Sequence, residues 1–227
     1  MAAAPHNPKA KPPVSVASDE LPLAKPVDHV PDGSLASLRE QAAECQACPL
    51  WRNATQTVFG AGNPRARVML IGEQPGNQED LEGKPFVGPA GKLLRSALDA
   101  AGIATRDLYV TNTVKHFKFE RRGKLRIHKR ASASEQAACR PWLAAELLRV
   151  QPHLIVALGA MAAQTVFGNA FRLTAERGVW HPLAGGRRGM ATWHPSAILR
   201  MPVEGRERAR EEFFGDIEAL AGAMRKP

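Results

Sequence analysis

Short apolar runs alternate with segments of helical periodicity along most of this chain, and this alternation restricts the possible folds. Parallel strands need crossover connections, and helices usually supply them. The sequence therefore predicts an α/β protein, a three-layer α/β/α sandwich around a short, mainly parallel sheet. The expected strands are 66–73, 107–114, 153–159 and 189–196, and the expected helices are 88–102, 134–151, 160–168 and 205–224.

The first 34 residues differ from the rest, with seven prolines and no aromatic residue. Such a segment buries too little apolar surface to offset the entropy lost on ordering. We predict a disordered proline-rich tail over 1–34 and one folded domain over 35–227. Ser37 is the expected cap of the first helix.

The 227-residue chain has a formal net charge of +9 and an isoelectric point near 9.9, which favours nucleic acid as partner. No apolar run has the length of a membrane-spanning helix, and residues 1–16 lack the apolar core of a secretory signal. We expect a cytoplasmic monomer without membrane contact, associated with the nucleoid in a bacterium.

Three cysteines are too few for a disulfide framework. Cys45 and Cys48 form a Cys-x-x-Cys pair in "CQACPL", and Cys139 lies far along the chain. In a cytosolic protein this spacing indicates metal ligation or redox chemistry.

Polar residues follow the first expected strand, in the stretch "GEQPGNQEDLEGKPFVGPAGKLL" (72–94). Ligands of such sheets bind beyond the carboxyl ends of the strands, where Glu73 and Gln74 are expected. Phe86 offers an aromatic face beside a helix start that is suited to phosphate. A polar loop with a core phenylalanine is the equal alternative. The turn is formed by Gly72, Pro75 and Gly76.

Two further strand ends carry polar residues. Asn112 ends the second strand and can offer a donor and an acceptor to a base, although a lone asparagine there is more often a turn former. His194 and Ser196 lie in "HPSAILR", a turn that is weak evidence alone.

In combination, these motifs resemble the uracil-DNA glycosylase superfamily. The matching pieces are "GEQPG", the "ED" that ends in Asp80, "PFVG", Asn112 and "HPSAILR", and the similarity runs from about Cys45 to the last helix. The "CQACPL" start resembles the iron–sulfur branch, family 4. The resemblance implies a [4Fe-4S] cluster, with zinc as the alternative, on Cys45, Cys48, His116 and Cys139.

Three departures from family 4 are similar to the UDGX class. His116 stands in place of a cysteine, Gln74 in place of alanine, and a basic segment over 121–130 precedes Cys139. His116 is alternatively a non-ligand beside three cysteines. Members of that class attach covalently to uracil-containing DNA through a histidine, which by position is His128. The alternative is that His128 is one more phosphate contact.

The resemblance also implies roles. Phe86 stacks on the base, Asn112 binds its polar edge, and His194 lies near the uracil oxygen. Glu73 and Gln74 lie beside the sugar. Further substrate contacts are expected from Gly72, Pro75, Gly76, Asp80 and Ser196. The expected DNA phosphate contacts are Arg121, Arg122, Lys124, Arg126, Lys129 and Arg130.

The sequence thus predicts a protein that recognises and excises uracil in DNA, single strands included, and forms a covalent bond from His128 to C1′ in a single turnover. A neutral imidazole is a competent nucleophile near neutral pH. One alternative is a glycosylase with ordinary turnover. Another is a non-catalytic iron–sulfur module that binds DNA.

Overall fold

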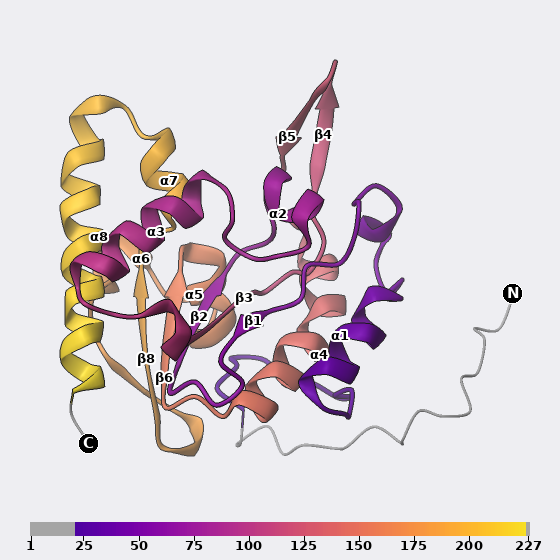
Figure 1. The fold of residues 1–227 in the computed structure, drawn as a ribbon, viewed down its shortest axis with the longest axis horizontal. Helices are drawn as coiled ribbons and strands as arrows, with labels where there is room; N and C mark the ends of the chain where they lie inside the picture. Colours follow the sequence, from indigo (N-terminus) through magenta and orange to yellow (C-terminus); the bar gives the residue numbers. More distant parts are fainter. Residues whose placement is uncertain (1–20, 226–227) are drawn as a thin grey trace, which may run out of the picture.

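The computed structural model describes residues 21–225, which form a six-stranded sheet between two helical layers (Figure 1). The strand order is β1-β3-β2-β6-β8-β7, with parallel pairing among β3, β2, β6 and β8 and antiparallel edge strands. The predicted sandwich is confirmed. The strands are β1 (Ala61–Gly62), β2 (Val68–Gly72), β3 (Leu108–Asn112), β6 (Leu154–Leu158), β7 (His181–Leu183) and β8 (Arg187–Thr192).

Successive side chains of the central strands point into opposite cores. Met69 and Ile71 pack with α1, α4 and α5, whereas Val68 and Leu70 pack with α3, α7 and α8. The helices are α1 (Leu35–Ala43), α2 (Asn77–Glu82), α3 (Pro89–Ala100), α4 (Ala133–Val150), α5 (Ala160–Phe167), α6 (Leu173–Glu176), α7 (Pro195–Arg200) and α8 (Val203–Met224).

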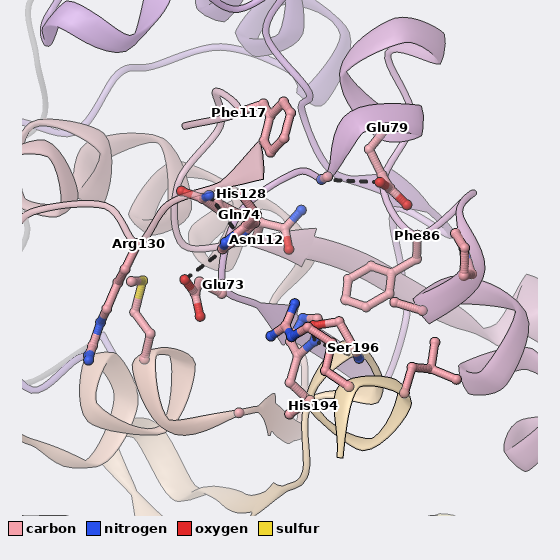
Figure 2. A pocket seen from close by; sticks show the side chains of 18 of the residues that line it. Glu73, Gln74, Glu79, Phe86, Asn112, Phe117, His128, Arg130, His194 and Ser196 are labelled. Atoms are coloured by element: carbon pink, nitrogen blue, oxygen red, sulfur yellow. Dashed lines mark hydrogen bonds and ion pairs between the residues drawn. The ribbon is translucent and has the colours of Figure 1, made fainter. Parts of the chain in front are cut away.

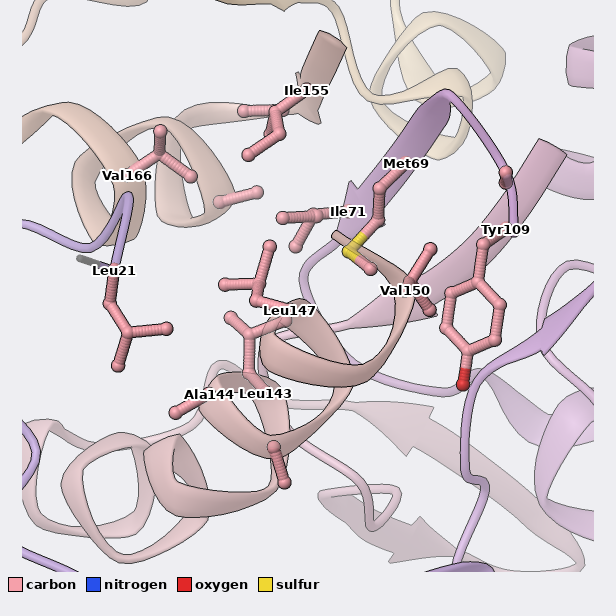
Figure 3. Packing of buried hydrophobic residues seen from close by; sticks show 14 of the residues in the cluster. Leu21, Met69, Ile71, Tyr109, Leu143, Ala144, Leu147, Val150, Ile155 and Val166 are labelled. Carbon is pink, nitrogen blue, oxygen red and sulfur yellow. The ribbon is translucent and has the colours of Figure 1, made fainter. Parts of the chain in front are cut away.

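The predicted tail needs correction over residues 21–34. Leu21 is 5% exposed and packs with Val166 and Leu147 in the core that Met69 and Ile71 share with α1, α4 and α5 (Figure 3). Val30, in the same core, is 1% exposed. Asp32 forms an ion pair with Arg149 of α4. A few apolar residues among the prolines thus suffice to fix this stretch on the domain. The remainder of the predicted tail, 1–20, lies outside the described residues.

The first helix begins earlier than predicted. Ser34, not Ser37, is the N-cap of α1, and its Oγ accepts a hydrogen bond from the Ser37 N–H at 3.2 Å. Ser34 fits the cap position because its backbone is extended.

The basic segment folds as a β-hairpin that we did not predict. Antiparallel strands β4 (Phe119–Arg122) and β5 (Leu125–His128) form a separate two-stranded sheet that projects from the domain (Figure 1). The chain turns at Gly123, whose φ of 58° suits a two-residue hairpin turn. The high charge of this segment had concealed its alternation.

No helix within residues 21–225 is both long enough and apolar enough to cross a bilayer.

Candidate active site

A cavity of 720 Å³ lies where β2, β3 and β8 end, the expected ligand position in a parallel sheet (Figure 2). Its walls come from strand ends, from α7 and from the β4–β5 hairpin. The structure therefore brings together segments separated by more than 100 residues. The predicted site residues that line it are Glu73, Gln74, Gly76, Phe86, Asn112, Arg126, His128, Arg130, His194 and Ser196.

Asn112 is the most unusual polar residue of the cavity. It is 1% exposed, and neither its Oδ1 nor its Nδ2 has a hydrogen-bond partner within the described residues. A buried amide without partners carries a substantial free-energy cost unless a ligand satisfies it. Asn112 is therefore suited to bind a ligand with one donor and one acceptor.

Gly72 provides the space for this arrangement. A Cβ at Gly72 would lie 2.3 Å from Asn112 Oδ1 and 2.7 Å from Phe86 Cζ. Any larger residue would push apart the amide and the aromatic ring. Gly72 therefore leaves room for both side chains, and its predicted substrate contact stays a prediction.

Phe86 lies beside Asn112 in a constrained backbone conformation. Its φ is +56°, and its carbonyl oxygen accepts a hydrogen bond from Arg95 Nη1 at 2.8 Å. The centroids of the Phe86 and His194 rings are 5.9 Å apart. A left-handed phenylalanine is rare, and the surrounding contacts must maintain it. The ring is a preformed apolar face for a planar ligand.

His194 caps α7 and is held by the residue that follows Pro195. Its Nδ1 accepts hydrogen bonds from the Ser196 N–H at 3.1 Å and from Ser196 Oγ at 2.7 Å. Burial, with a smaller effect of the Arg200 cation, lowers the pKa of His194 to about 4. The neutral ring therefore carries its proton on Nε2, which makes this atom a hydrogen-bond donor.

Glu73 places a carboxylate in the cavity wall, directly after the end of β2. Burial raises the pKa of Glu73, while the cations of Arg130 and Arg200 act in the opposite direction. A carboxylate near two guanidinium groups in a partly dry site can interact strongly with positive charge on a ligand.

His128 reaches the cavity from the end of β5. Its Nε2 lies 2.9 Å from Gln74 Nε2 and 4.0 Å from Glu73 Oε1. Gln74 Nε2 also donates to the Lys129 carbonyl at 2.9 Å, which fixes the orientation of the amide. His128 Nε2 must therefore accept, so its lone pair is directed at the Gln74 amide in the cavity wall. Burial, and secondarily Arg200, lower the pKa of His128.

Arg126 fastens the hairpin to the domain. Its Nη1 lies 2.6 Å from Asp80 Oδ2, and its Nε donates to Asn77 Oδ1 at 2.6 Å. The guanidinium also lies over the rings of Phe117 and Phe119. Arg126 is thus paired with Asp80, and its predicted phosphate contact stays a prediction, whereas the predicted substrate contact of Asp80 needs correction. Asp80 is fully buried and does not line the cavity.

The other predicted phosphate contacts are distributed along the hairpin. Arg121, Arg122 and Lys124 are exposed on its outer part. Lys129 pairs with Glu120 at 2.7 Å, and Arg130 lines the cavity.

Pro75 does not line the cavity, and the turn that it shapes leads into α2. Glu79, which we did not single out, accepts hydrogen bonds from the Gly76 N–H at 3.1 Å and the Gly88 N–H at 2.7 Å (Figure 2). It therefore joins the starts of α2 and α3, on either side of Phe86.

The cysteines lie near one another but have no complete ligand shell. The Trp142 Nε1–H donates to Cys45 Sγ at 3.2 Å, and the Lys115 N–H donates to Cys139 Sγ at 3.1 Å. Burial raises the pKa of Cys139 to about 12, and the charges of Cys45 and Cys48 act in the same direction.

His116 belongs to a different contact. Its Nε2 lies 2.9 Å from Thr57 Oγ1. Among residues 21–225, no three or more histidine, cysteine, aspartate or glutamate side chains are grouped so that they could hold a metal ion. The predicted four-residue ligand group is therefore not formed by the side chains as they stand.

Two features of the site were missed in the sequence. The cation of Arg200 acts to lower the pKa of Glu73, His128 and His194. Arg200 is the last residue of the "HPSAILR" motif, but we assigned it no role from the sequence. The buried Lys115 donates to the Asn112 carbonyl at 2.7 Å and pairs with Glu146 at 2.5 Å. A lysine after a strand and a glutamate in a helix gave no signal of their pairing.

The chain belongs to the uracil-DNA glycosylase superfamily. A sequence model described as "Uracil DNA glycosylase superfamily" matches residues 59–218, most of the chain. A type-4 uracil-DNA glycosylase of Thermotoga maritima is 40% identical over 71% of this chain and 81% of its own length. The type-4 enzyme of Archaeoglobus fulgidus is 34% identical over 82% and 92%, respectively. A type-5 uracil-DNA glycosylase of Thermus thermophilus is 29% identical over 78% and 82%.

Proposed function

We propose that this protein excises uracil from DNA by cleaving the N-glycosidic bond. The observation that carries this proposal is Asn112, a buried amide with two unpartnered polar atoms beside the ring of Phe86. The edge of uracil offers a carbonyl acceptor and an N–H donor to such an amide. Relatives named uracil-DNA glycosylases that align with most of the chain support the same substrate.

The departing base needs stabilisation as an anion. A target nucleotide must first leave the base stack to enter the cavity. Phe86 then covers one face of the ring, and the Nε2–H of His194 donates to the oxygen on which negative charge develops. A donor positioned for the transition state in this way typically contributes a factor of about 10²–10³ in rate.

The sugar becomes positively charged as the bond breaks. Glu73 lines the same cavity as His194, and its carboxylate stabilises this charge and orients a water molecule. The water oxygen bonds to C1′, the C1′–N1 bond breaks, and uracil takes up a proton. The products are free uracil and an abasic site, and the protein is regenerated.

This proposal is tested with an oligonucleotide that contains one uracil and a matched oligonucleotide with thymine. Wild-type protein should produce alkali-labile abasic sites only with uracil, and Asn112→Ala should lose most of this activity. Equal cleavage of both oligonucleotides, or full activity in the variant, would contradict the role of Asn112.

A second candidate function is covalent capture of the sugar by His128. The observation that favours it is the position of His128, which lines the cavity with its acceptor Nε2 4.0 Å from Glu73 Oε1. To attack, this nitrogen must first release its hydrogen bond from Gln74 Nε2. In this route Nε2 bonds to C1′ as the C1′–N1 bond breaks. Uracil takes up a proton, and the alkylated imidazole loses its Nδ1 proton. The product has no good route to hydrolysis, so turnover stops at one event.

The two routes are distinguished after complete denaturation. Covalent capture gives a protein–DNA band that survives heating and is absent with thymine and in His128→Ser. Ordinary turnover gives abasic DNA in molar excess over protein and no such band. Either pattern leaves the excision of uracil itself intact.

We also propose that Cys45, Cys48 and Cys139 hold an iron–sulfur cluster with a structural role. The N–H donors to two of the sulfurs fit the surroundings of such a cluster. With Nε2 beside Thr57, His116 would have to ligate through Nδ1. Visible absorption with iron and sulfide analysis of the purified protein tests this proposal, and Cys139→Ser should lose the signal. Zinc without iron would support the alternative metal.

For the substrate, we propose single-stranded DNA in addition to duplex, because an unpaired base costs less to extrude. Cleavage of single-stranded and duplex oligonucleotides of one sequence tests this. We propose a monomer, which sedimentation measures.

A further inference from the structure

The β4–β5 hairpin has two different faces. Side chains of a strand alternate between faces. In β5, Arg126 and His128 point toward the domain, since they contact Asp80 and Gln74. Leu125 and Ile127 therefore point the other way.

This outward face is apolar and uncovered. Leu125 is 66% exposed and Ile127 is 38% exposed, and neither belongs to a hydrophobic cluster within residues 21–225. In the register of the two strands, Arg122 lies opposite Leu125, and Glu120 lies opposite Ile127. Single exposed apolar residues are common, but two neighbours on one face of a projecting hairpin form a small contact surface.

The charges around this surface indicate its partner. Arg121, Arg122 and Lys124 surround the turn, and neither Arg122 nor Lys124 forms an ion pair in the described part of the chain. Exposed apolar groups among unpaired cations match a single-stranded nucleic acid, which combines apolar base faces with anionic phosphates.

We propose that Arg122, Leu125 and Ile127, the outward hairpin face, form a second DNA-binding surface that packs against unstacked bases beside the target nucleotide. This inference rests on the proposed function, because the nucleotide in the cavity positions the strand. Leu125 lies three residues from His128, a distance of about 10 Å along a strand. At ~3.4 Å per stacked nucleotide this distance covers at most roughly three nucleotides, and fewer where the strand is unstacked.

The test uses single-stranded oligonucleotides with 2-aminopurine one, two or three nucleotides from the target, on either side. The target is 2′-fluoro-deoxyuridine, since fluorine destabilises positive charge at C1′ and preserves the bond during titration. Binding of wild-type protein should raise the fluorescence of one 2-aminopurine as its neighbours unstack. The variant Leu125→Thr/Ile127→Thr retains β propensity, and it should abolish the rise and weaken binding about fivefold or more.

The salt dependence of binding gives an independent readout. The variant should keep the wild-type slope of log K against log salt, because no cation is removed. Val179→Ser is the matched control, since Val179 is 51% exposed and lies elsewhere. It should bind as wild type does.

Wild-type fluorescence and affinity in the hairpin variant would overturn the inference. So would self-association of the wild-type protein that the variant abolishes while DNA binding is unchanged, because the face would then belong to a second copy of the chain. If wild-type protein leaves a deoxyuridine oligonucleotide intact, the proposed function itself fails, and that outcome is distinct from both.

Discussion

The strand-end wall and the hairpin wall of the cavity are built in different ways. Gly72 and Asn112 end two paired central strands, and the Lys115 Nζ donates a hydrogen bond to the Asn112 carbonyl oxygen. The hairpin has only two strands and is attached mainly through Arg126 and Gln74. The groups that we propose to recognise a base thus lie on the strand-end wall, which we call the rigid wall. The candidate nucleophile lies on the hairpin wall, which has fewer attachments.

Two lysine–glutamate pairs make the comparison quantitative. Lys115 and Glu146 are 2.5 Å apart with side chains 1% and 0% exposed. On the hairpin, Lys129 and Glu120 are 2.7 Å apart with side chains 48% and 53% exposed. The distances are similar, but only the buried pair leaves an uncompensated charge in a dry interior when one partner is removed.

The largest effect is expected from Lys115→Met. It should lower the free energy of unfolding by ~3–5 kcal/mol, because Glu146 remains buried and unpaired. Chemical denaturation of the purified protein measures this. Lys129→Met is the matched control and should change stability by less than ~1 kcal/mol. Equal losses in both variants would remove the distinction between the two walls.

The next effect concerns pH and His194. Its pKa of about 4 lies below the ordinary value, so the native ring stays neutral while the unfolded chain takes up a proton. Stability should therefore fall as pH falls from about 6.5 to about 4, by ~1.4 kcal/mol per unit of pKa shift, or roughly 3 kcal/mol in all.

His194→Gln isolates this contribution. The difference in stability between wild type and variant should shrink as pH falls through this window and stay constant above it. Other groups, such as Glu73, titrate equally in both proteins. Parallel stability curves from pH 7 to pH 4 would show that His194 is not held neutral.

Gly72→Ala should disturb the rigid wall locally. The added methyl group meets both Asn112 and Phe86, so we expect excision to slow by roughly 100-fold, as misplacement of about 1 Å can do. Single-turnover release of uracil measures this. Gly215→Ala, where a Cβ has open space, should release uracil at the wild-type rate. A fully active Gly72→Ala would mean that the wall adapts.

The smallest effect separates two hairpin arginines. Arg122→Gln should reduce the salt slope of DNA binding by about one, because Arg122 is exposed and forms no ion pair within residues 21–225. Arg126→Gln should leave the slope unchanged, because Arg126 is bound to Asp80. A loss of slope in Arg126→Gln alone would reverse the assignment.

The sequence predicted the rigid wall better than the hairpin. Buried strands are apolar runs, and their ends are marked by polar residues such as Glu73 and Asn112. In the hairpin, charged residues occupy both faces. The alternation of apolar Leu125 and Ile127 with polar neighbours was therefore not recognised among arginines such as Arg121 and Arg126.

Long-range pairing was also beyond sequence reasoning. Asp80 and Arg126 are 46 residues apart, and Lys115 and Glu146 are 31 apart. From the sequence, Asp80 and Arg126 were assigned roles from their local motifs, and Lys115 and Glu146 were assigned none. The packing of Leu21 and Val30 was missed because proline content dominated the interpretation of that segment.

The most direct test of the account is uracil release in a single turnover, with protein in excess, by wild type, Asn112→Ala and His128→Ser. We assign base release to the strand-end wall and the fate of the sugar to the hairpin. We therefore predict that Asn112→Ala slows release by about 100-fold and that His128→Ser stays within about tenfold of wild type. Near-normal release by Asn112→Ala, with release abolished in His128→Ser, would contradict this assignment.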